Sequence, residues 1–281
     1  MKKYLTAKSF TLTIATAIVI LFSLVGCSSD TGQKLDQRNW ELTWSDEFDG
    51  TSGMLPDAKK WTYDIGNGGW GNQELQYYTN RPENVSLDGV GNLVITAKNE
   101  SLGGSAFTSA RVKTQGLYTQ AYGRFEARIK SPYGPGIWPA FWMLGANIDT
   151  TPWPQCGEID IMEIKGNQPS IVYGTLHGPG YSGGNAITDF YALMNNRFDK
   201  DFHIFAVEWD ADKIDFFVDG YLYQRLTKST VSAEGEWVFN QPFYMIMNIA
   251  VGGTFVGFPT VDTSFPQKMT IDYVRVYKLA E

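Results

Sequence analysis

Short runs of alternating apolar and polar residues, separated by glycine and proline, make up the chain from Trp40 onward. Residues 124–130 alternate charged and apolar side chains without a break, which predicts a β-strand with one solvated face. A second run at 213–218 precedes Asp219-Gly220 and a further run at 221–225, which together predict a β-hairpin. Further strands are expected at 93–97, 202–209, 243–250 and 270–277.

No amphipathic helix of useful length and no internal repeat interrupts this pattern. Many short strands without a linker predict one all-β domain, a two-sheet antiparallel β-sandwich. The stretch 132–154 differs, because it is rich in glycine and proline and carries Trp138, Phe141, Trp142 and Trp153. We expect it to be a loop that forms the wall of a binding site.

The N-terminal segment has a different composition. Lys2, Lys3 and Lys8 precede an apolar run at 10–25, which is shorter than the roughly 20 residues that span a bilayer and is typical of a signal peptide. The run ends in Leu-Val-Gly-Cys27, which resembles a bacterial lipobox. An ordinary signal peptide with a chance cysteine, or a membrane helix, fits this ending less well.

The chain is therefore divided into a lipoprotein signal peptide at 1–26, an acylated Cys27 with a polar tether at 27–39, and a folded domain at 40–281. The expected product is an exported lipoprotein anchored to the membrane, at the outer membrane or cell surface if the cell is Gram-negative. Acylation of Cys27 leaves Cys156 without a disulfide partner, so we expect Cys156 to be a small buried side chain.

Charge and residue counts exclude several classes of function. The chain has 30 acidic and 23 basic residues, a net charge of −7, and loss of the three lysines before Gly26 takes it to −10. Such a chain is a poor ligand for nucleic acids or sulfated glycans. Two histidines make a multi-histidine metal site improbable, and two cysteines exclude a disulfide framework. Aromatic residues, at 15%, suit a bulky core or a cleft that stacks sugars.

The most informative segment is 157–164 (GEIDIMEI). Glu158 and Asp160 share one face of a strand, but Glu163 comes five residues after Glu158 and would point to the opposite face. One extra residue, a β-bulge at Ile161-Met162, returns Glu163 to the face of the other two. We expect the remaining apolar residues to be buried behind them, namely Ile159, Ile161, Met162 and Ile164.

Three carboxyl groups on one wall repel one another, which raises the pKa of at least one, as a general acid requires. Hydrolysis of a glycosidic bond needs one carboxylate as nucleophile or base and one carboxylic acid as proton donor. Retaining enzymes hold this pair about 5–5.5 Å apart, a spacing that two glutamates on one face of a bulged strand suit. A solvent-facing acidic strand is the alternative, which the apolar backing disfavours.

The sequence Glu-Ile-Asp-Ile-Met-Glu resembles the signature of glycoside hydrolase family 16 in its bulged E-x-D-x-x-E form. Within that family the chain is most similar to bacterial endo-β-1,3-glucanases (laminarinases), over nearly all of 40–277. Further matching blocks are WSDEF (44–48), GWGNQE (69–74), YGRFEAR (122–128), GIWPAFWML (136–144) and IDYVRVY (271–277). The resemblance implies a jelly-roll, concanavalin-like sandwich with an open cleft on its concave sheet.

The resemblance also implies residue roles. Glu158 is the expected nucleophile, Glu163 the acid/base, and Asp160 the group that holds the nucleophile through a shared proton. Eight residues are expected to contact the glycan, Phe255 in place of the tryptophan common in the family: Asn72, Arg111, Trp138, Trp142, Trp153, His177, Asn248 and Phe255. His203 is expected to be structural.

The family often binds one structural calcium ion away from the cleft. Glu47, the carbonyl of Gly91 and Asp272 match the ligand positions, and oxygen ligands suit that ion. An ordinary surface acid or turn is the alternative for each position. No cofactor is expected for catalysis.

These observations predict an enzyme that hydrolyses internal β-1,3 bonds of β-glucans such as laminarin. It would be a monomer that contacts the membrane only through its lipid and has no nucleic-acid partner. Mixed-linkage β-1,3-1,4-glucan, an agar-type galactan, or non-catalytic β-glucan binding are the alternatives. The bulged spacing disfavours a lichenase acting on mixed-linkage glucan. A neutral glucan is favoured over agar by the Trp-Pro-Ala-Phe-Trp block and by the absence of a cationic cleft. A non-catalytic binding protein is disfavoured because both glutamates are present.

Overall fold

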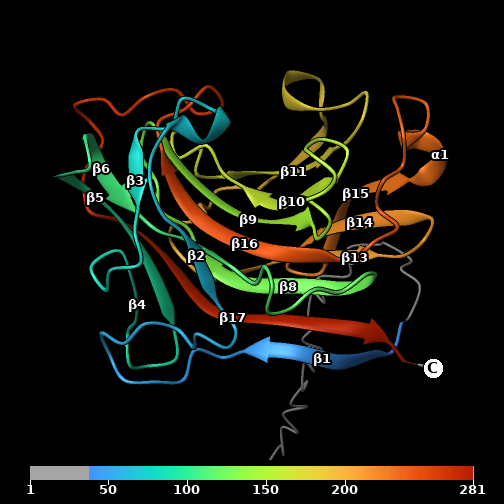
Figure 1. Ribbon diagram of the computed structural model, residues 1–281, viewed down its shortest axis with the longest axis horizontal. Helices are drawn as coiled ribbons and strands as arrows, with labels where there is room; N and C mark the ends of the chain where they lie inside the picture. Colours follow the sequence, from blue (N-terminus) through green and yellow to red (C-terminus); the bar gives the residue numbers. More distant parts are fainter. Residues whose placement is uncertain (1–37, 281) are drawn as a thin grey trace, which may run out of the picture. The chain divides into compact units, whose positions relative to one another are not determined.

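The computed structural model describes residues 38–280. The predicted signal peptide, Cys27 and the tether up to residue 37 lie outside these described residues. The rest is an all-β fold of two sheets, as predicted (Figure 1). Neighbouring strands pair antiparallel except β3 and β6, which are parallel. Among the described residues, no helix has the length and apolar character needed to cross a bilayer.

One sheet has ten strands. Its order is β15 (Tyr221–Thr227), β14 (Lys213–Val218), β13 (His203–Trp209), β8 (Gly123–Lys130), β17 (Gln267–Leu279), β5 (Leu93–Leu102), β6 (Ser105–Ser109) and β3 (Gln76–Tyr78), with β1 (Trp40–Asp46) paired to β17 and β4 (Val85–Leu87) paired to β5.

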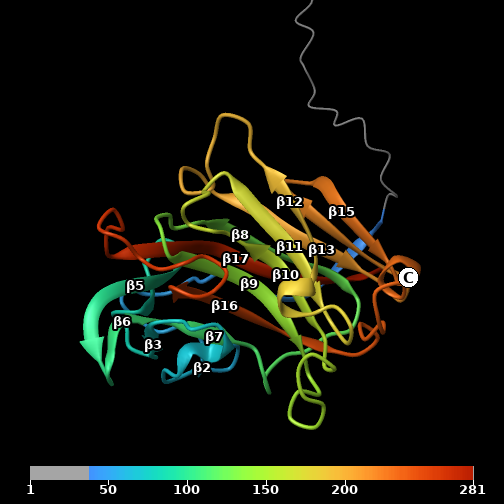
Figure 2. The ribbon, with the colours of Figure 1, turned by 90° about the horizontal axis from the view of Figure 1, so that it is seen from above.

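The other sheet has seven strands. Its order is β12 (Ile187–Ala192), β11 (Ile171–His177), β10 (Glu158–Glu163), β9 (Ile137–Gly145), β16 (Phe243–Val251), β7 (Arg111–Lys113) and β2 (Thr62–Asp64) (Figure 2). Three short helical turns lie in the connections, η1 (Gly69–Gly71), η2 (Gly183–Asn185) and α1 (Lys228–Val231).

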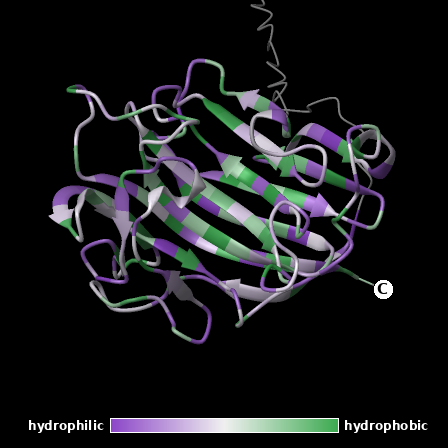
Figure 3. Cartoon of the chain, turned by 45° about the horizontal axis from the view of Figure 1, so that its top comes forward, coloured by the Kyte–Doolittle hydropathy of each residue, from purple (hydrophilic) through white to green (hydrophobic). Residues whose placement is uncertain are grey.

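The core lies between the two sheets. Alternate residues of β8, such as Phe125 and Ile129, pack in one cluster with Phe141 of β9 and Met245 of β16. The alternation of apolar and polar positions along the strands is visible in Figure 3, and it lets one face of each sheet pack inward while the other face stays available. The seven-stranded sheet can therefore present polar side chains on its outer face without disturbing the core.

The predicted hairpin is confirmed as β14 and β15. Asp219 and Gly220 connect the strands, with φ of 50° and 81°. Two residues with positive φ match the right-handed twist of the flanking strands, and glycine adopts this conformation without steric cost.

The prediction of a loop over 132–154 is wrong for its central part, because Ile137–Gly145 forms β9 in the middle of the seven-stranded sheet. Both faces of this strand carry bulky apolar residues, so it shows no alternation. Pro139 further disguises it, although its carbonyl still accepts a hydrogen bond from the N–H of Ile164.

The predicted β-bulge in β10 is confirmed. Asp160 pairs with Trp142 of β9, but Phe141, the next residue back along β9, pairs with Met162, so β10 contains one extra residue. The register with β11 shifts at the same place. All four apolar residues expected behind the carboxyl groups, Ile159, Ile161, Met162 and Ile164, are at most 1% exposed.

Two further predictions concern side chains outside the bulge. Cys156 is buried, as expected. His203 is also buried, and its Nδ1 lies 2.6 Å from the Asp219 carboxylate at the hairpin turn, which fits a structural role.

The bulge can be tested by deleting Ile161. Without the extra residue, Glu163 would follow Glu158 by four positions, and a regular strand would keep both on the cleft face. An alanine inserted between Met162 and Glu163 would instead turn Glu163 to the core-facing side of β10, where an unpaired carboxyl group costs several kcal/mol. We expect the insertion to lower the melting temperature far more than the deletion, which removes one buried side chain and keeps Glu163 in the cleft. Equal melting temperatures for the two variants in a thermal denaturation series would contradict this account of the bulge.

Candidate active site

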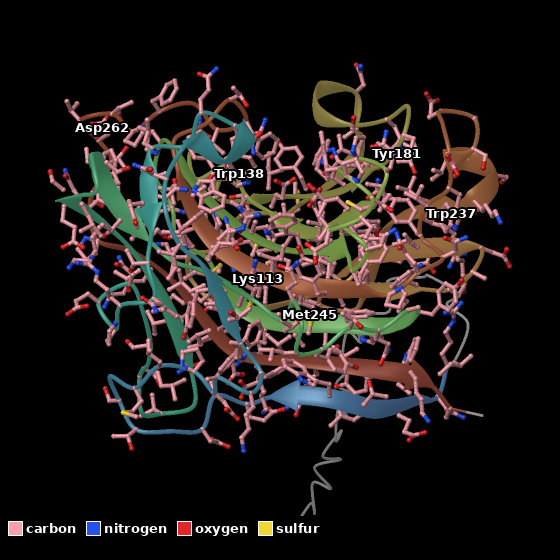
Figure 4. All side chains as sticks on the ribbon, in the orientation of Figure 1. Lys113, Trp138, Tyr181, Trp237, Met245 and Asp262 are labelled. Carbon is pink, nitrogen blue, oxygen red and sulfur yellow. The ribbon has the colours of Figure 1, made fainter. Side chains whose placement is uncertain are left out.

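A cleft of about 780 Å³ lies on the outer face of the seven-stranded sheet. Side chains from β7, β16, β9, β10, β11 and β12 form its floor, and residues of η1 and η2 also line it. Trp138 projects from this face, whereas Met245 lies between the two sheets (Figure 4).

The bulged strand β10 contributes Glu158, Asp160 and Glu163 to the cleft wall. Each glutamate accepts a hydrogen bond from a tryptophan of a different segment. Trp153 Nε1 donates to Glu158 Oε2 at 2.8 Å, and Trp138 Nε1 donates to Glu163 Oε1 at 2.9 Å. The indole rings therefore fix the two carboxyl groups and also border the space in which a ligand would lie.

Burial controls the protonation of this triad. Desolvation raises the pKa of Glu158 to about 8, and the neighbouring charge of Asp160 adds to the shift. Desolvation likewise raises the pKa of Glu163 to about 7. The pKa of Asp160 lies well above its ordinary value because of burial and the charge of Glu163. Such close carboxyl groups titrate as one set, so near neutral pH they share protons.

Asp160 is the most deeply buried of the three carboxyl groups, which favours its protonated form. Its side chain is hydrogen-bonded to Glu158 and is 3% exposed. A protonated Asp160 donates to the Glu158 carboxylate, and this hydrogen bond stabilises the ionised form of Glu158. This arrangement leaves Glu158 as the carboxylate and Glu163 as the group that can donate a proton.

His177 is held in one tautomer by the backbone. The N–H of Gly183 donates to its Nδ1 at 3.1 Å, so in the neutral ring the proton is on Nε2. Nε2 lies 3.1 Å from Asp160 Oδ2 and 3.6 Å from Glu158 Oε1. The imidazole therefore faces a buried Asp160 oxygen that has no hydrogen-bond partner among the described residues.

The other half of the cleft centres on Arg111. Its guanidinium carbon lies 4.7 Å from the ring centre of Trp142 and 5.2 Å from that of Trp70. Asp64, at 3.2 Å, balances the charge, and Glu74 lies close by in the same lining. Aromatic faces with compensated charges suit a neutral, hydroxyl-rich ligand.

All of the residues expected to contact a ligand lie in the cleft lining: Asn72, Arg111, Trp138, Trp142, Trp153, His177, Asn248 and Phe255. Some are also connected to one another, since Trp142 Nε1 donates to Asn248 Oδ1 at 2.8 Å and Phe255 packs on Trp138 with ring centres 5.1 Å apart.

The cleft also contains residues that sequence reasoning missed. Trp70 and Glu74 belong to the block 69–74, which also contains the predicted Asn72, so this block is the sequence signal for both residues. Thr175 and Thr188 pair across β11 and β12, and no local chemical pattern distinguishes these threonines from other surface residues.

The expected calcium ligands have other partners. The Glu47 carboxylate accepts two hydrogen bonds from Arg275, and Asp272 Oδ2 accepts one from Arg128 at 2.6 Å. Among the described residues, the one group of three or more acidic, histidine or cysteine side chains with converging ligand atoms is Glu158, Asp160 and His177. Calcium binding by Glu47, the Gly91 carbonyl and Asp272 therefore stays a prediction.

Known proteins resemble the chain along most of its length. A family model described as "Glycosyl hydrolases family 16" matches residues 72–275. The "Beta-glucanase" of Rhodothermus marinus is 44% identical over 271 residues, covering 93% of this chain and 94% of that protein.

Two solved structures are similar in fold and sequence. The laminarinase catalytic domain from Thermotoga maritima is 48% identical with a TM-score of 0.82, covering 86% of this chain and 100% of that one. The endo-beta-1,3-glucanase from Pyrococcus furiosus is 46% identical with a TM-score of 0.83, covering 89% of this chain and 98% of that one.

The raised pKa of Glu163 predicts a pH-dependent stability. An unfolded glutamate releases its proton near pH 4.3, but folded Glu163 does so near pH 7. Between these values the folded state binds more protons, so the free energy of unfolding falls as pH rises. We expect Glu163→Gln to be more stable than the wild type at pH 8, by up to about 3 kcal/mol, and similar at pH 4. Surface Glu41→Gln is the control, and a difference independent of pH between Glu163→Gln and the wild type would refute the assignment.

Proposed function

Because the chain belongs to family 16 of the glycosyl hydrolases, we propose that it is a retaining endo-β-1,3-glucanase that cleaves internal bonds of β-glucans such as laminarin. The observation that carries this proposal is the β-bulge in β10, which brings Glu158, Asp160 and Glu163 to one wall of the cleft. The similarity of the chain to laminarinases over most of its length supports laminarin-type β-glucan as the substrate.

The reaction proceeds through two displacements. Glu163, in its acid form, gives its proton to the oxygen of the leaving sugar while the Glu158 carboxylate attacks the anomeric carbon. Asp160 keeps its proton, which it directs at Glu158 before attack. Glu163, now a carboxylate, then takes a proton from water, whose oxygen displaces Glu158 and releases the second product.

The compensated charges of the Arg111 half of the cleft support a glucan substrate. Arg111 is compensated by Asp64, and the ring centres of Trp70 and Trp142 lie 5.2 Å and 4.7 Å from its guanidinium carbon. Uncharged pyranose rings can stack on such faces, and Asn72 and Asn248 can bond their hydroxyl groups. The catalytic residues come from one chain, and we propose that the enzyme acts as a monomer.

The proposal predicts which glucan is cleaved and by which group. The domain should release reducing ends from laminarin much faster than from barley mixed-linkage glucan or agarose. Glu158→Gln should lower kcat by at least about 10⁴-fold, because the nucleophile is removed. Exposed Glu83→Gln is the matched control and should retain full activity.

Other outcomes would change the assignment. Substantial turnover by Glu158→Gln would remove Glu158 from the nucleophile role. Comparable rates on mixed-linkage glucan would widen the specificity without altering the mechanism. Binding of laminarin without turnover by the wild type would favour a glucan-binding protein.

We further propose that Cys27 is acylated after removal of residues 1–26 and that the lipid anchors the enzyme to the membrane. The support is the Leu-Val-Gly-Cys ending of the apolar run. In a bacterial host, labelled palmitate should be incorporated into the full-length protein and the protein should sediment with membranes. Cys27→Ala should lose both properties, while Cys156→Ala should keep them. Membrane association of Cys27→Ala equal to that of the wild type would exclude the lipid anchor.

A further inference from the structure

A row of aromatic rings continues from the cleft over β11 and β12. The ring centre of Phe255 lies 5.1 Å from that of Trp138 and 5.7 Å from that of Tyr173, which in turn lies 6.3 Å from that of Phe190. Phe190 is 54% exposed. Aromatic side chains therefore connect the indole that binds Glu163 to the end strand of the sheet.

The strand register places the last two rings on the cleft face. Tyr173 pairs with Glu163 on one side and with Phe190 on the other. Thr175 and Thr188, each two residues from one of these aromatic residues, line the cleft. Because residues two apart in a strand share a face, Tyr173 and Phe190 extend the same surface toward the sheet edge, which β12 forms (Figure 2).

A lysine adds hydrogen-bond donors to these rings. Lys165 Nζ lies 4.3 Å from the ring centre of Phe255 and 5.1 Å from that of Tyr173. In the part of the chain that the structure describes, no carboxylate forms an ion pair with it. Ring faces beside free ammonium donors are the groups that bind the apolar face and the hydroxyl groups of a pyranose.

The position of Glu163 identifies which sugar this surface would hold. Glu163 protonates the leaving oxygen, so the sugar attached to that oxygen must lie beside it. Tyr173 is the neighbour of Glu163 on β11, away from the Arg111 half of the cleft. We propose that Tyr173 and Phe190 form a stacking platform for the glucose units on the leaving-group side of the cleaved bond, an inference that rests on the proposed function.

The same platform can hold an acceptor sugar after the first displacement. A hydroxyl group of the acceptor then gives its proton to the Glu163 carboxylate, and its oxygen forms a bond to the anomeric carbon. The bond between that carbon and Glu158 breaks, and its electron pair returns to the Glu158 carboxylate. The result is a longer glucan, formed in place of hydrolysis.

The test compares a long substrate with one that cannot reach the platform. Laminarihexaose can place several sugars beyond Glu163, whereas 4-nitrophenyl β-laminaribioside has only a small aryl leaving group. For Phe190→Ala, the ratio of kcat/KM on the hexaose to kcat/KM on the aryl glycoside should fall about three- to tenfold, the loss expected for one stacking contact. The fraction of transfer products at high hexaose concentration should fall with it.

Two matched variants complete the experiment. Phe190→Trp should keep the ratio near the wild-type value, because it retains a ring. Met194→Ala truncates an exposed side chain that lies outside the row of rings, at 85% exposure, and should leave the ratio unchanged.

Each alternative result is decisive. An unchanged ratio in Phe190→Ala, an equal fall in Met194→Ala, or a proportional loss on both substrates would overturn the platform while leaving the glucanase assignment intact. If the wild type cleaves neither substrate, the proposed function fails and the platform fails with it.

Discussion

The crowding of three carboxyl groups on one strand is the constraint that the rest of the site must satisfy. Glu158, Asp160 and Glu163 lie together in the cleft wall, where burial and mutual repulsion oppose their ionisation. Two indole N–H groups donate to the glutamates, and His177 Nε2 lies 3.1 Å from Asp160. The apolar side of the same strand packs into the core between the sheets. This packing holds the three carboxyl groups close together despite their mutual repulsion.

The supporting groups come from distant parts of the chain, which shows why the sandwich is needed. Trp138 belongs to β9, Trp153 precedes β10, and Gly183 lies beyond β11. Hydrogen bonding between neighbouring strands of the sheet fixes their register and therefore the positions of these segments along the strands. A shift of one residue in either neighbouring strand would turn the supporting side chains away from the carboxyl groups.

The catalytic carboxyl groups could be predicted from the sequence more readily than the strands and side chains that surround them. The spacing of Glu158 and Glu163 required a bulge, and the backing residues identified the buried face, so β10 was predicted correctly. Strand β9 was mistaken for a loop because both of its faces are apolar and Pro139 interrupts it. The pairing of Glu47 with Arg275 and the row of rings ending at Phe190 depend on contacts between distant segments, and local patterns carry no information about them.

The tryptophans that bind the two glutamates also border the ligand space, and this has a thermodynamic consequence. A sugar that stacks on Trp138 or Trp153 must change the solvation and geometry of the hydrogen bond from that indole to its carboxyl group. Occupancy of the cleft is therefore linked to the proton affinity of the triad, and binding is accompanied by uptake or release of protons. The heat of glucan binding then includes the ionisation heat of the buffer, and the apparent affinity varies with pH even when no bond is cleaved.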